Sequence, residues 1–198
     1  MNKSPKMVDG GTLSSRNKLL MSKLVVFYNN KKNIDELLPI INGNTELSLR
    51  IIDWFVTNYC KKHNITYYLK NGENDTDSEQ FIVWLRYKMQ LKSFLKKQFD
   101  PFCRRERICF FYNNGNDLDH IITTIGQLNF FKWAIERGVI SYIKNHIKEI
   151  EKDMNDNIRK NYIKKSKKNN TRKKRKELSS CAMKNMNRHS HKFSLSFD

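Results

Sequence analysis

The sequence lacks the motifs that mark known active sites, and it has few cysteines. None of the patterns G-x-x-x-x-G-K, G-x-G-x-x-G, H-E-x-x-H or G-x-S-x-G occurs, and no set of serine, histidine and acid can be singled out. The four cysteines are irregularly spaced and no secretory signal opens the chain, so we expect a reducing, intracellular setting. We therefore predict a protein that is not an enzyme and that binds no cofactor.

Two scattered patterns leave metal chemistry open. A zinc site could be assembled from either of two sets of ligands, Cys60, His63, Cys103 and Cys109, or Cys181, His189 and His191. Paired C-x-x-C spacings are missing, so we expect structural cysteines and no metal. Asp53, Asp100 and Glu149 could gather as in a nuclease, but their spacing alone does not require it. Asp100 beside Pro101 is more typical of a cap or turn.

Long apolar runs are also absent. The longest candidates are interrupted by Lys, Arg or Asn and fall short of the roughly 18 residues that a membrane span needs. We expect a soluble protein with no membrane span. A chain of 198 residues with 38% apolar residues can bury one core, so a single folded domain with flanking segments is favoured.

Positive charge is what the sequence has in excess. The net charge is +18 at pH 7, and residues 157–198 hold 14 Lys or Arg against Glu177 and Asp198, which amounts to +12. The first 156 residues therefore carry only +6. A flexible basic segment of this kind attracts a polyanion, which is usually nucleic acid and can also be an anionic membrane.

Within this segment, residues 159–176 contain 11 basic residues and no acid. Lys and Arg displace condensed counterions from a nucleic-acid backbone, which gives affinity without sequence choice and a steep dependence on salt. Two other interpretations stay open, a solubilising tail and a nuclear import signal at residues 173–176. The candidate nucleic-acid-binding residues here are Arg159, Lys160, Lys164, Lys165, Lys167, Lys168, Arg172, Lys173, Lys174, Arg175 and Lys176.

A second basic cluster is predicted near the middle of the chain. Lysines recur every four residues along one helix face, and three arginines follow within about a dozen residues. Arginine forks suit phosphate oxygens, so the cluster could form a phosphate-facing ridge. The alternative is an ordinary solvated helix face, with Glu106 paired to a neighbouring arginine. The candidate residues are Lys88, Lys92, Lys96, Arg104, Arg105 and Arg107.

The hydrophobic patterns predict an α+β fold, in which amphipathic helices pack on a small, mostly antiparallel sheet. We expect a flexible, disordered leader (1–22), a single α+β domain (23–158) and a basic arm (159–198) that ends in a strand-like segment at 193–197. Strands are predicted at 23–28, 66–70, 81–85, 108–112 and 120–124. The third strand is expected to be buried on both faces, and the fourth to lie inside the sheet beside the antiparallel fifth. Helices are predicted at 45–63, 86–100, 124–137 and 139–163, with only a turn or two before Pro39.

The stretch from Gln98 to Gly138 carries the clearest local signals. Asn and Gly at 113–116 favour a hairpin turn. Thr124 and Gln127 fit a capping box, and Gly138 fits a left-handed helix cap. The many aromatic residues of the helix between them indicate core packing, with a base-stacking platform as the alternative.

Four segments carry a resemblance to a known family. They are I-I-D-W-F-V-T-N-Y (51–59), Q-F-D-P-F-C-R-R-E-R-I (98–108), T-T-I-G-Q-L-N-F-F-K-W-A-I (123–135) and the closing S-F-D (196–198). They resemble an uncharacterised protein family of nucleocytoplasmic large DNA viruses, the giant viruses, over about residues 47–150 plus the tail. The resemblance implies a viral setting and no established activity. In that setting, a small basic protein would serve the viral DNA.

We therefore predict a non-enzymatic, nucleic-acid-associated viral protein that binds phosphate backbones without sequence specificity, in genome packaging or as an accessory of transcription or replication. The expected partner is nucleic acid, with DNA favoured, and other virion proteins are a further option. The alternatives are a virion structural or scaffolding protein and a nucleic-acid enzyme with an unrecognised site. The expected location is the virion or the host cytoplasm, in the viral factory, with the host nucleus as an alternative.

Overall fold

The computed structural model describes residues 6–7, 12–70, 78–112 and 119–168. The described residues form two units that divide between Asn157 and Ile158, and each is considered by itself. The hairpin turn predicted at 113–116 and the strand-like segment predicted at 193–197 lie outside the described residues.

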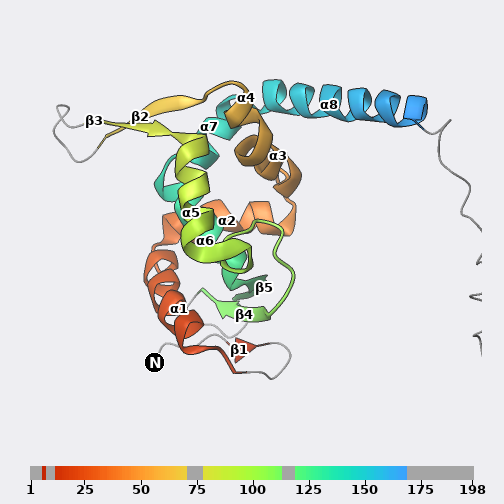
Figure 1. Ribbon diagram of the computed structural model, residues 1–198. Coiled ribbons are helices and arrows are strands. Elements are labelled where there is room, and N and C mark those ends of the chain that lie inside the picture. The colour runs from red at the N-terminus through yellow and green to blue at the C-terminus, as the bar shows by residue number, and fades with distance from the viewer. Residues whose placement is uncertain (1–5, 8–11, 71–77, 113–118, 169–198) are drawn as a thin grey trace, which may run out of the picture. The chain divides into compact units, whose positions relative to one another are not determined.

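Helices and strands both contribute to the first unit, which confirms the predicted α+β class (Figure 1). The strands are β1 (Lys6–Met7), β2 (Thr66–Lys70), β3 (Ser78–Ile82), β4 (Arg107–Phe111) and β5 (His120–Thr124). The helical elements are α1 (Ser15–Tyr28), α2 (Lys31–Asn42), α3 (Leu49–Trp54), the π-helical η1 (Phe55–Tyr59), α4 (Cys60–Lys62), α5 (Val83–Gln98), α6 (Ile125–Glu136), α7 (Val139–Asn145) and α8 (Ile147–Lys168). Within the described ranges, no helix is both long and apolar enough to cross a membrane.

The strands form two small antiparallel sheets. One has the order β1-β4-β5, so β4 lies inside it beside the antiparallel β5, as predicted. The other is the β2-β3 ribbon, in which Tyr67 lies opposite Phe81. The prediction of a doubly buried strand at 81–85 was wrong, because β3 ends at Ile82, which is 39% exposed, and Val83 already begins α5. A short apolar run does not by itself distinguish a strand from the start of a buried helix.

Residues 23–28 end a helix, so the strand predicted there was wrong. The Ser14 hydroxyl caps α1 by accepting a hydrogen bond from the Asn17 N–H at 3.3 Å. Asn17, Met21, Leu24 and Tyr28 follow a helical spacing and are all buried. The β-branched and aromatic residues at 24–28 favour a strand, but the segment is a helix, in which one face can be buried. The helix also takes in residues 15–22, where a disordered leader was predicted.

Two further helices differ from their predicted form. α2 runs for 12 residues through Pro39 and ends at Gly43, whose φ is +73°, instead of lasting a turn or two. Because Pro39 lies in the last turns, its missing N–H removes only one hydrogen bond of the helix. The helix predicted at 45–63 begins later, after the Ser48 cap, and widens into the π-helical turn η1. The helix predicted at 139–163 is broken at His146 into α7 and α8.

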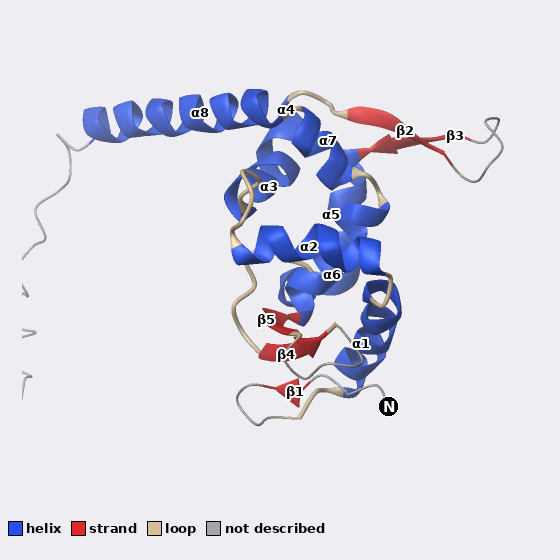
Figure 2. Ribbon diagram, turned by 180° about the vertical axis from the view of Figure 1, so that it is seen from behind, coloured by secondary structure: helices blue, strands red, loops and turns tan. Residues whose placement is uncertain are grey.

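Helix α6 lies in the middle of the first unit, in contact with α1, α2, α5 and α7 (Figure 2). Eight of its 12 residues are buried, so the helix is enclosed on nearly every side. The Tyr28 hydroxyl of α1 donates to the carbonyl oxygen of Leu128 at 2.8 Å, and burial raises the pKa of this tyrosine. The aromatic side chains of α6 therefore form core, as predicted.

Phe99, just after α5, joins the aromatic side chains of α5 and α6. It is 0% exposed, and its ring centre lies 5.3 Å from that of Phe130 and 5.5 Å from that of Trp133. Phe94 and Tyr87 also pack against it. Aromatic pairs at these separations are attractive beyond the area that they bury.

The second unit begins with the C-terminal part of α8. This helix continues to Lys168, past residue 163 where it was predicted to end. The first ten residues of the predicted flexible arm are thus helical. Arg159 and Lys160 are exposed there.

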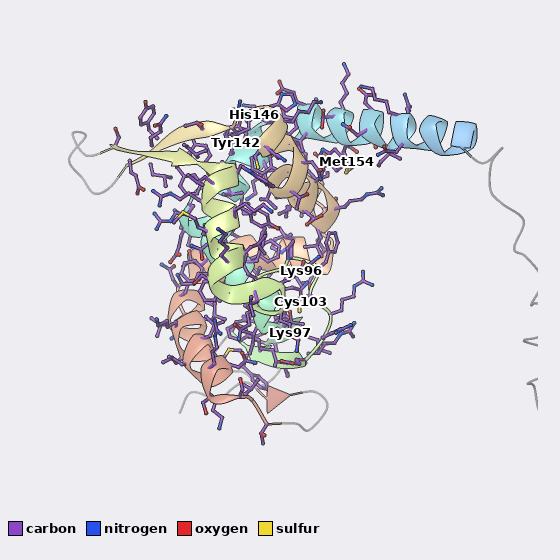
Figure 3. The ribbon with its side chains drawn as sticks, in the orientation of Figure 1. Lys96, Lys97, Cys103, Tyr142, His146 and Met154 are labelled. Carbon is purple, nitrogen blue, oxygen red and sulfur yellow. The ribbon has the colours of Figure 1, made fainter. Side chains whose placement is uncertain are left out.

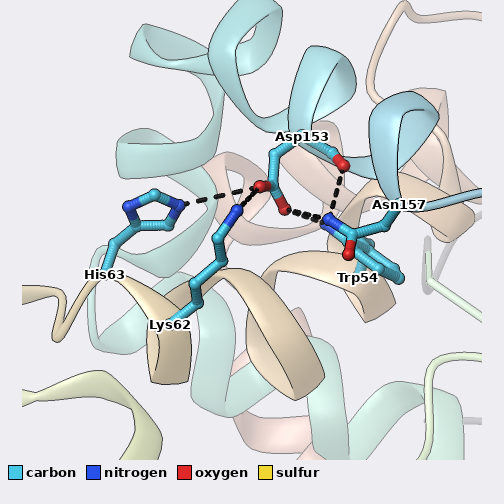
Figure 4. Close-up of polar contacts among 5 residues, drawn as sticks. All are labelled: Trp54, Lys62, His63, Asp153 and Asn157. Atoms are coloured by element: carbon cyan, nitrogen blue, oxygen red, sulfur yellow. Dashed lines mark hydrogen bonds and ion pairs between the residues drawn. The ribbon is translucent and has the colours of Figure 1, made fainter. Parts of the chain in front are cut away.

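The Asp153 carboxylate joins α8 to the end of α3 and to α4 within the first unit (Figure 4). It accepts a hydrogen bond from the Trp54 indole at 3.1 Å and forms an ion pair with Lys62. His63 Nε2 lies 3.8 Å away, and the Asn157 amide donates at 3.3 Å. Burial alone would raise the pKa of Asp153, but the bonds from Lys62 and Trp54 outweigh it and hold the pKa below its usual 3.8.

We expect Phe99→Ala to lower the free energy of unfolding by about 3–5 kcal/mol, because it leaves a cavity among four aromatic rings. Urea denaturation followed by circular dichroism measures the change. Met89→Ala is the control, since that side chain is 51% exposed and its truncation should change stability by less than about 0.5 kcal/mol. A loss below about 1 kcal/mol in Phe99→Ala would contradict the packing described.

We expect Asp153→Asn to lower stability at pH 7 by about 0.5–1 kcal/mol, since Lys62 is half exposed and water screens the pair. A lowered pKa gives stability that is present above the unfolded value near 3.8 and is lost as the pH falls through the folded value. The difference from the parent should therefore shrink between pH 5 and pH 3 in urea titrations. Both proteins carry His63→Gln, so that the contact between His63 and Asp153 does not contribute to the difference. A difference that stays constant with pH would oppose this account.

Candidate functional site

Four of the six predicted residues of the middle cluster lie between the last turn of α5 and the start of β4, on residues 96–107, here called the basic loop. They are Lys96, Arg104, Arg105 and Arg107. Arg104, Arg105 and Arg107 are exposed. Within the described part of the chain, none of the three forms an ion pair. Glu106 accepts a hydrogen bond from the Asn17 amide at 3.4 Å instead of pairing with an arginine. The charges of the three arginines are thus not neutralised by an acid among the described residues.

Each end of the basic loop has an unusual backbone conformation. Leu95 has φ 61° and ψ 161°, which interrupts the helical geometry of α5, and Glu106 has φ 56°. Side chains other than glycine rarely adopt positive φ, and such strain persists only where the surroundings hold it. Strained positions of this kind collect at binding and catalytic sites.

Hydrogen bonds tie the basic loop to the start of α6. The Asp100 N–H donates to the carbonyl of Gly126 at 3.3 Å, and the Thr124 hydroxyl donates to the carbonyl of Cys103 at 3.3 Å. Thr124 caps α6 as predicted, by accepting from the Gln127 N–H. The Gln127 side chain does not complete the predicted capping box, because its oxygen accepts from the Thr123 hydroxyl at 3.1 Å. Its NH2 group donates to the carbonyl of Pro101 at 2.9 Å. The capping residues therefore hold the loop as well as the helix.

Gly126 lets the basic loop approach α6 closely. A Cβ at this position would lie 2.9 Å from the Lys97 carbonyl oxygen and 3.1 Å from the Cβ of Cys103. Neither contact is tolerated without a shift of the loop. The loop is thus packed closely against α6 and has an unusual backbone conformation at each end.

Three hollows adjoin one another around the basic loop. The largest measures about 450 Å³, and its lining is Lys96, Lys97, Asp100, Phe102, Cys103, Arg104, Arg105 and Glu106. Lys97 and Arg105 also border a hollow of about 220 Å³ that Arg16 of α1 lines. Arg104 borders a third, of about 290 Å³, together with Arg107. Figure 3 shows Lys96, Lys97 and Cys103 close together at the end of α5.

Two cations at this site were not among the predicted residues. Lys97 lies off the predicted lysine row, follows the interruption of the helix at Leu95, and lines two of the hollows. Arg16 lies in the region that the sequence suggested was a leader. The helical spacing of the buried residues of α1 and the preceding Ser14 were the signals that could have revealed it.

The lysines of α5 do not form one straight ridge with the arginines. Lys88 and Lys92 are exposed on the regular part of the helix, and the Lys88 ammonium lies 4.8 Å from the centre of the Trp84 ring. The Lys61 ammonium lies 5.3 Å from the same ring. Lys96 follows the interruption and faces Asp100 at 3.9 Å. The predicted row of three is therefore split between two surfaces.

The predicted residues of the arm are only partly described. Arg159 and Lys160 are exposed on α8, and the backbone at Lys164, Lys165, Lys167 and Lys168 is helical. Arg172, Lys173, Lys174, Arg175 and Lys176 lie outside the described residues.

The carboxylates proposed for a nuclease-like cluster divide into two places. Burial, and then the charge of Asp100, raise the pKa of Asp53, so these two lie near one another. Glu149 instead acts on Tyr59 and Tyr142, whose pKa values are raised first by burial and then by its charge. No group of three or more His, Cys, Asp or Glu side chains suited to a metal occurs among the residues described.

The cysteines that are described have separate environments. Cys60 is buried, its thiol donates to the Val56 carbonyl, and burial raises its pKa to about 12. Cys103 lies in the basic loop, and its sulfur is 3.6 Å from the carbonyl oxygen of Lys97. Cys181, His189 and His191 of the alternative zinc set lie outside the described residues.

Comparison of the sequence with known proteins finds a family profile and a viral protein that are similar to this chain. The profile of a family of unknown function, DUF7197, matches residues 9–198. "Uncharacterized protein L507" of Acanthamoeba polyphaga mimivirus is 42% identical over 137 residues, which are 68% of this chain and 51% of that protein. The chain thus spans about half the length of this relative. No solved structure matches.

We expect Gly126→Ala to displace the basic loop and to lower the free energy of unfolding by about 1–3 kcal/mol, because the added Cβ overlaps the Lys97 backbone. The Cys103 thiol should react faster with iodoacetamide, as followed by peptide mass spectrometry. Buried Cys60 is the internal control and should keep its rate. Unchanged stability together with an unchanged Cys103 rate would show that the loop does not depend on this contact.

Proposed function

The chain belongs to the DUF7197 family of unknown function, and we propose that it binds the phosphate backbone of nucleic acid without sequence specificity. The basic loop and residues 159–176 supply the cations. The observation that carries the proposal is the exposure of three arginines, without ion pairs to described residues, on a loop held against α6. We also propose that the protein is not an enzyme.

The chemistry of the basic loop suits phosphate. Arginine presents planar N–H groups that match phosphate oxygens two at a time. Four cations line the hollow of about 450 Å³, namely Lys96, Lys97, Arg104 and Arg105. The acids that line it are Asp100 and Glu106. A loop held in place in advance loses little conformational entropy on binding, so more of the contact energy appears as affinity.

The basic arm supports the same partner by a different route. Eleven Lys or Arg and no acid occur within 18 residues, and such a segment gains affinity by releasing counterions from a polyanion. Because both segments are rich in Lys and Arg, which contact phosphates, we propose binding along the backbone. The similarity to a mimivirus protein supports a viral setting, in which the DNA genome or its transcription and replication would supply the polyanion.

A second candidate function is a scaffold that binds other virion proteins. It is favoured by apolar side chains that remain exposed on α5 and the β2-β3 ribbon, where Leu85 is 52%, Met89 51% and Tyr68 68% exposed. Exposed apolar groups mark contacts between proteins where they form a contiguous patch. Crosslinking in purified particles separates the two candidates, since a scaffold would be linked mainly to capsid proteins.

We expect the double variant Arg104→Gln, Arg105→Gln to weaken binding of the full chain to mixed-sequence DNA by about tenfold near 0.1 M salt. The slope of log K against log salt should fall in magnitude by about 2, one for each phosphate contact. Fluorescence anisotropy between about 50 and 200 mM salt measures both quantities.

The charge-matched control for this experiment is Lys31→Gln, Lys32→Gln. These lysines are exposed at the start of α2 and line none of the three hollows. Their variant should lower the slope by less than 1. Equal effects of the two double variants would assign binding to overall charge and not to the basic loop. Binding by the parent that hardly changes with salt would overturn the proposed function itself.

A further inference from the structure

We propose that the largest hollow of the basic loop takes an unpaired base, which stacks on Phe102, so that the protein prefers single-stranded to double-stranded nucleic acid. This inference rests on the proposed function and specifies the substrate class of the same site. The phosphates on either side of that base would meet Lys96, Lys97, Arg104 and Arg105.

Phe102 differs from every other phenylalanine that the structure describes. Each of the others lies within about 6.3 Å of another aromatic ring, as Phe99 does with Phe130 and Phe94. Phe102 has no such ring partner among the described residues, although the aromatic core lies only three residues away at Phe99. It is half-buried and lines the hollow. A ring in this setting has a face left for a planar ligand.

The backbone around Phe102 fixes where the ring lies. Its N–H donates to the Asp100 carboxylate at 2.8 Å, in a turn that follows buried Pro101. The carbonyl of the next residue, Cys103, accepts a hydrogen bond from Thr124 at 3.3 Å. The ring is therefore carried by a segment anchored on both sides, which reduces the entropy lost when a base stacks on it.

The composition of the hollow suits a nucleotide better than a bare phosphate. Its volume of about 450 Å³ falls within the ~300–1,000 Å³ range of small-molecule sites. Phe102, Cys103 and the aliphatic stems of the basic residues supply an apolar surface, and the ammonium and guanidinium groups supply the charge. Proteins that bind single strands combine cations that follow the backbone with aromatic rings on which bases stack.

The geometry of a duplex explains why a single strand would bind better than a double strand. Bases in a duplex are stacked on their neighbours and paired, so reaching Phe102 would require breaking both contacts. An unpaired base can enter the hollow without that penalty. The arginines, in contrast, meet phosphates in either form, so loss of Phe102 should affect one form only.

The test measures binding of the full chain to a labelled 20-nucleotide single strand of mixed sequence and to the blunt duplex of the same sequence, across a salt series. We expect Phe102→Ala and Phe102→Leu to weaken single-strand binding by about tenfold at every salt concentration, with an unchanged salt slope. Duplex binding should change by less than twofold, and Phe102→Trp should retain single-strand affinity. Tyr68→Ala, which removes an exposed aromatic side chain of β2, is the matched control and should have no effect.

Phe102→Leu separates stacking from packing, because it keeps an apolar side chain and removes the ring. Urea denaturation verifies that each variant is folded. Equal losses on single strand and duplex, or no loss on the single strand, would overturn the inference. If Arg104→Gln, Arg105→Gln weakens both probes while the Phe102 variants weaken neither, the proposed function stands and only the base-stacking site fails.

Discussion

The close contact between the basic loop and the first turn of α6 is the constraint on which the described site depends. Gly126 leaves room for the Lys97 backbone, the Thr124 hydroxyl bonds both the loop and the start of the helix, and the Gln127 side chain bonds the loop. Because α6 is itself enclosed by α1, α2, α5 and α7, the loop inherits its position from the core. Strain at Leu95 and Glu106 is held by the same packing.

The protein has two kinds of basic segment, the basic loop and the arm, which differ in the number of their cations and in how these are positioned. The arginines of the basic loop are few and lie on a segment packed against α6; under the proposed function each would contact one phosphate. The arm has many cations within a short length, and its attraction to a polyanion depends chiefly on their number. Under the proposed function, the protein would first associate through the charge of the arm and then form the contacts of the basic loop, an order that electrostatic attraction generally favours.

The sequence allowed the local elements to be predicted where pattern and turn chemistry agreed. The strands at 66–70 and 120–124 and the Thr124 cap were correct in their bounds, because each is flanked by residues that end it. α1 was missed because its β-branched end outweighed its helical spacing. The positive φ at Leu95 could not be predicted, since no glycine or asparagine occurs there. The position of Lys97, two residues later, was therefore not predicted either. Arg16 belongs to the site only through the folding of α1, whose packing is a long-range property.

The π-helical turn η1 has a consequence for how relatives should be compared. Buried side chains at 51, 55 and 59, and at 52, 56 and 60, recur every four residues, whereas an α-helix turns by about 100° per residue and would drift by about 40° at each repeat. The wide turn absorbs that drift by accommodating an extra residue. A homologue that kept the same inward-facing side chains in a regular α-helix would be one residue shorter between Ser48 and Ile65, so a single-residue alignment gap there marks loss of the bulge and not loss of the core.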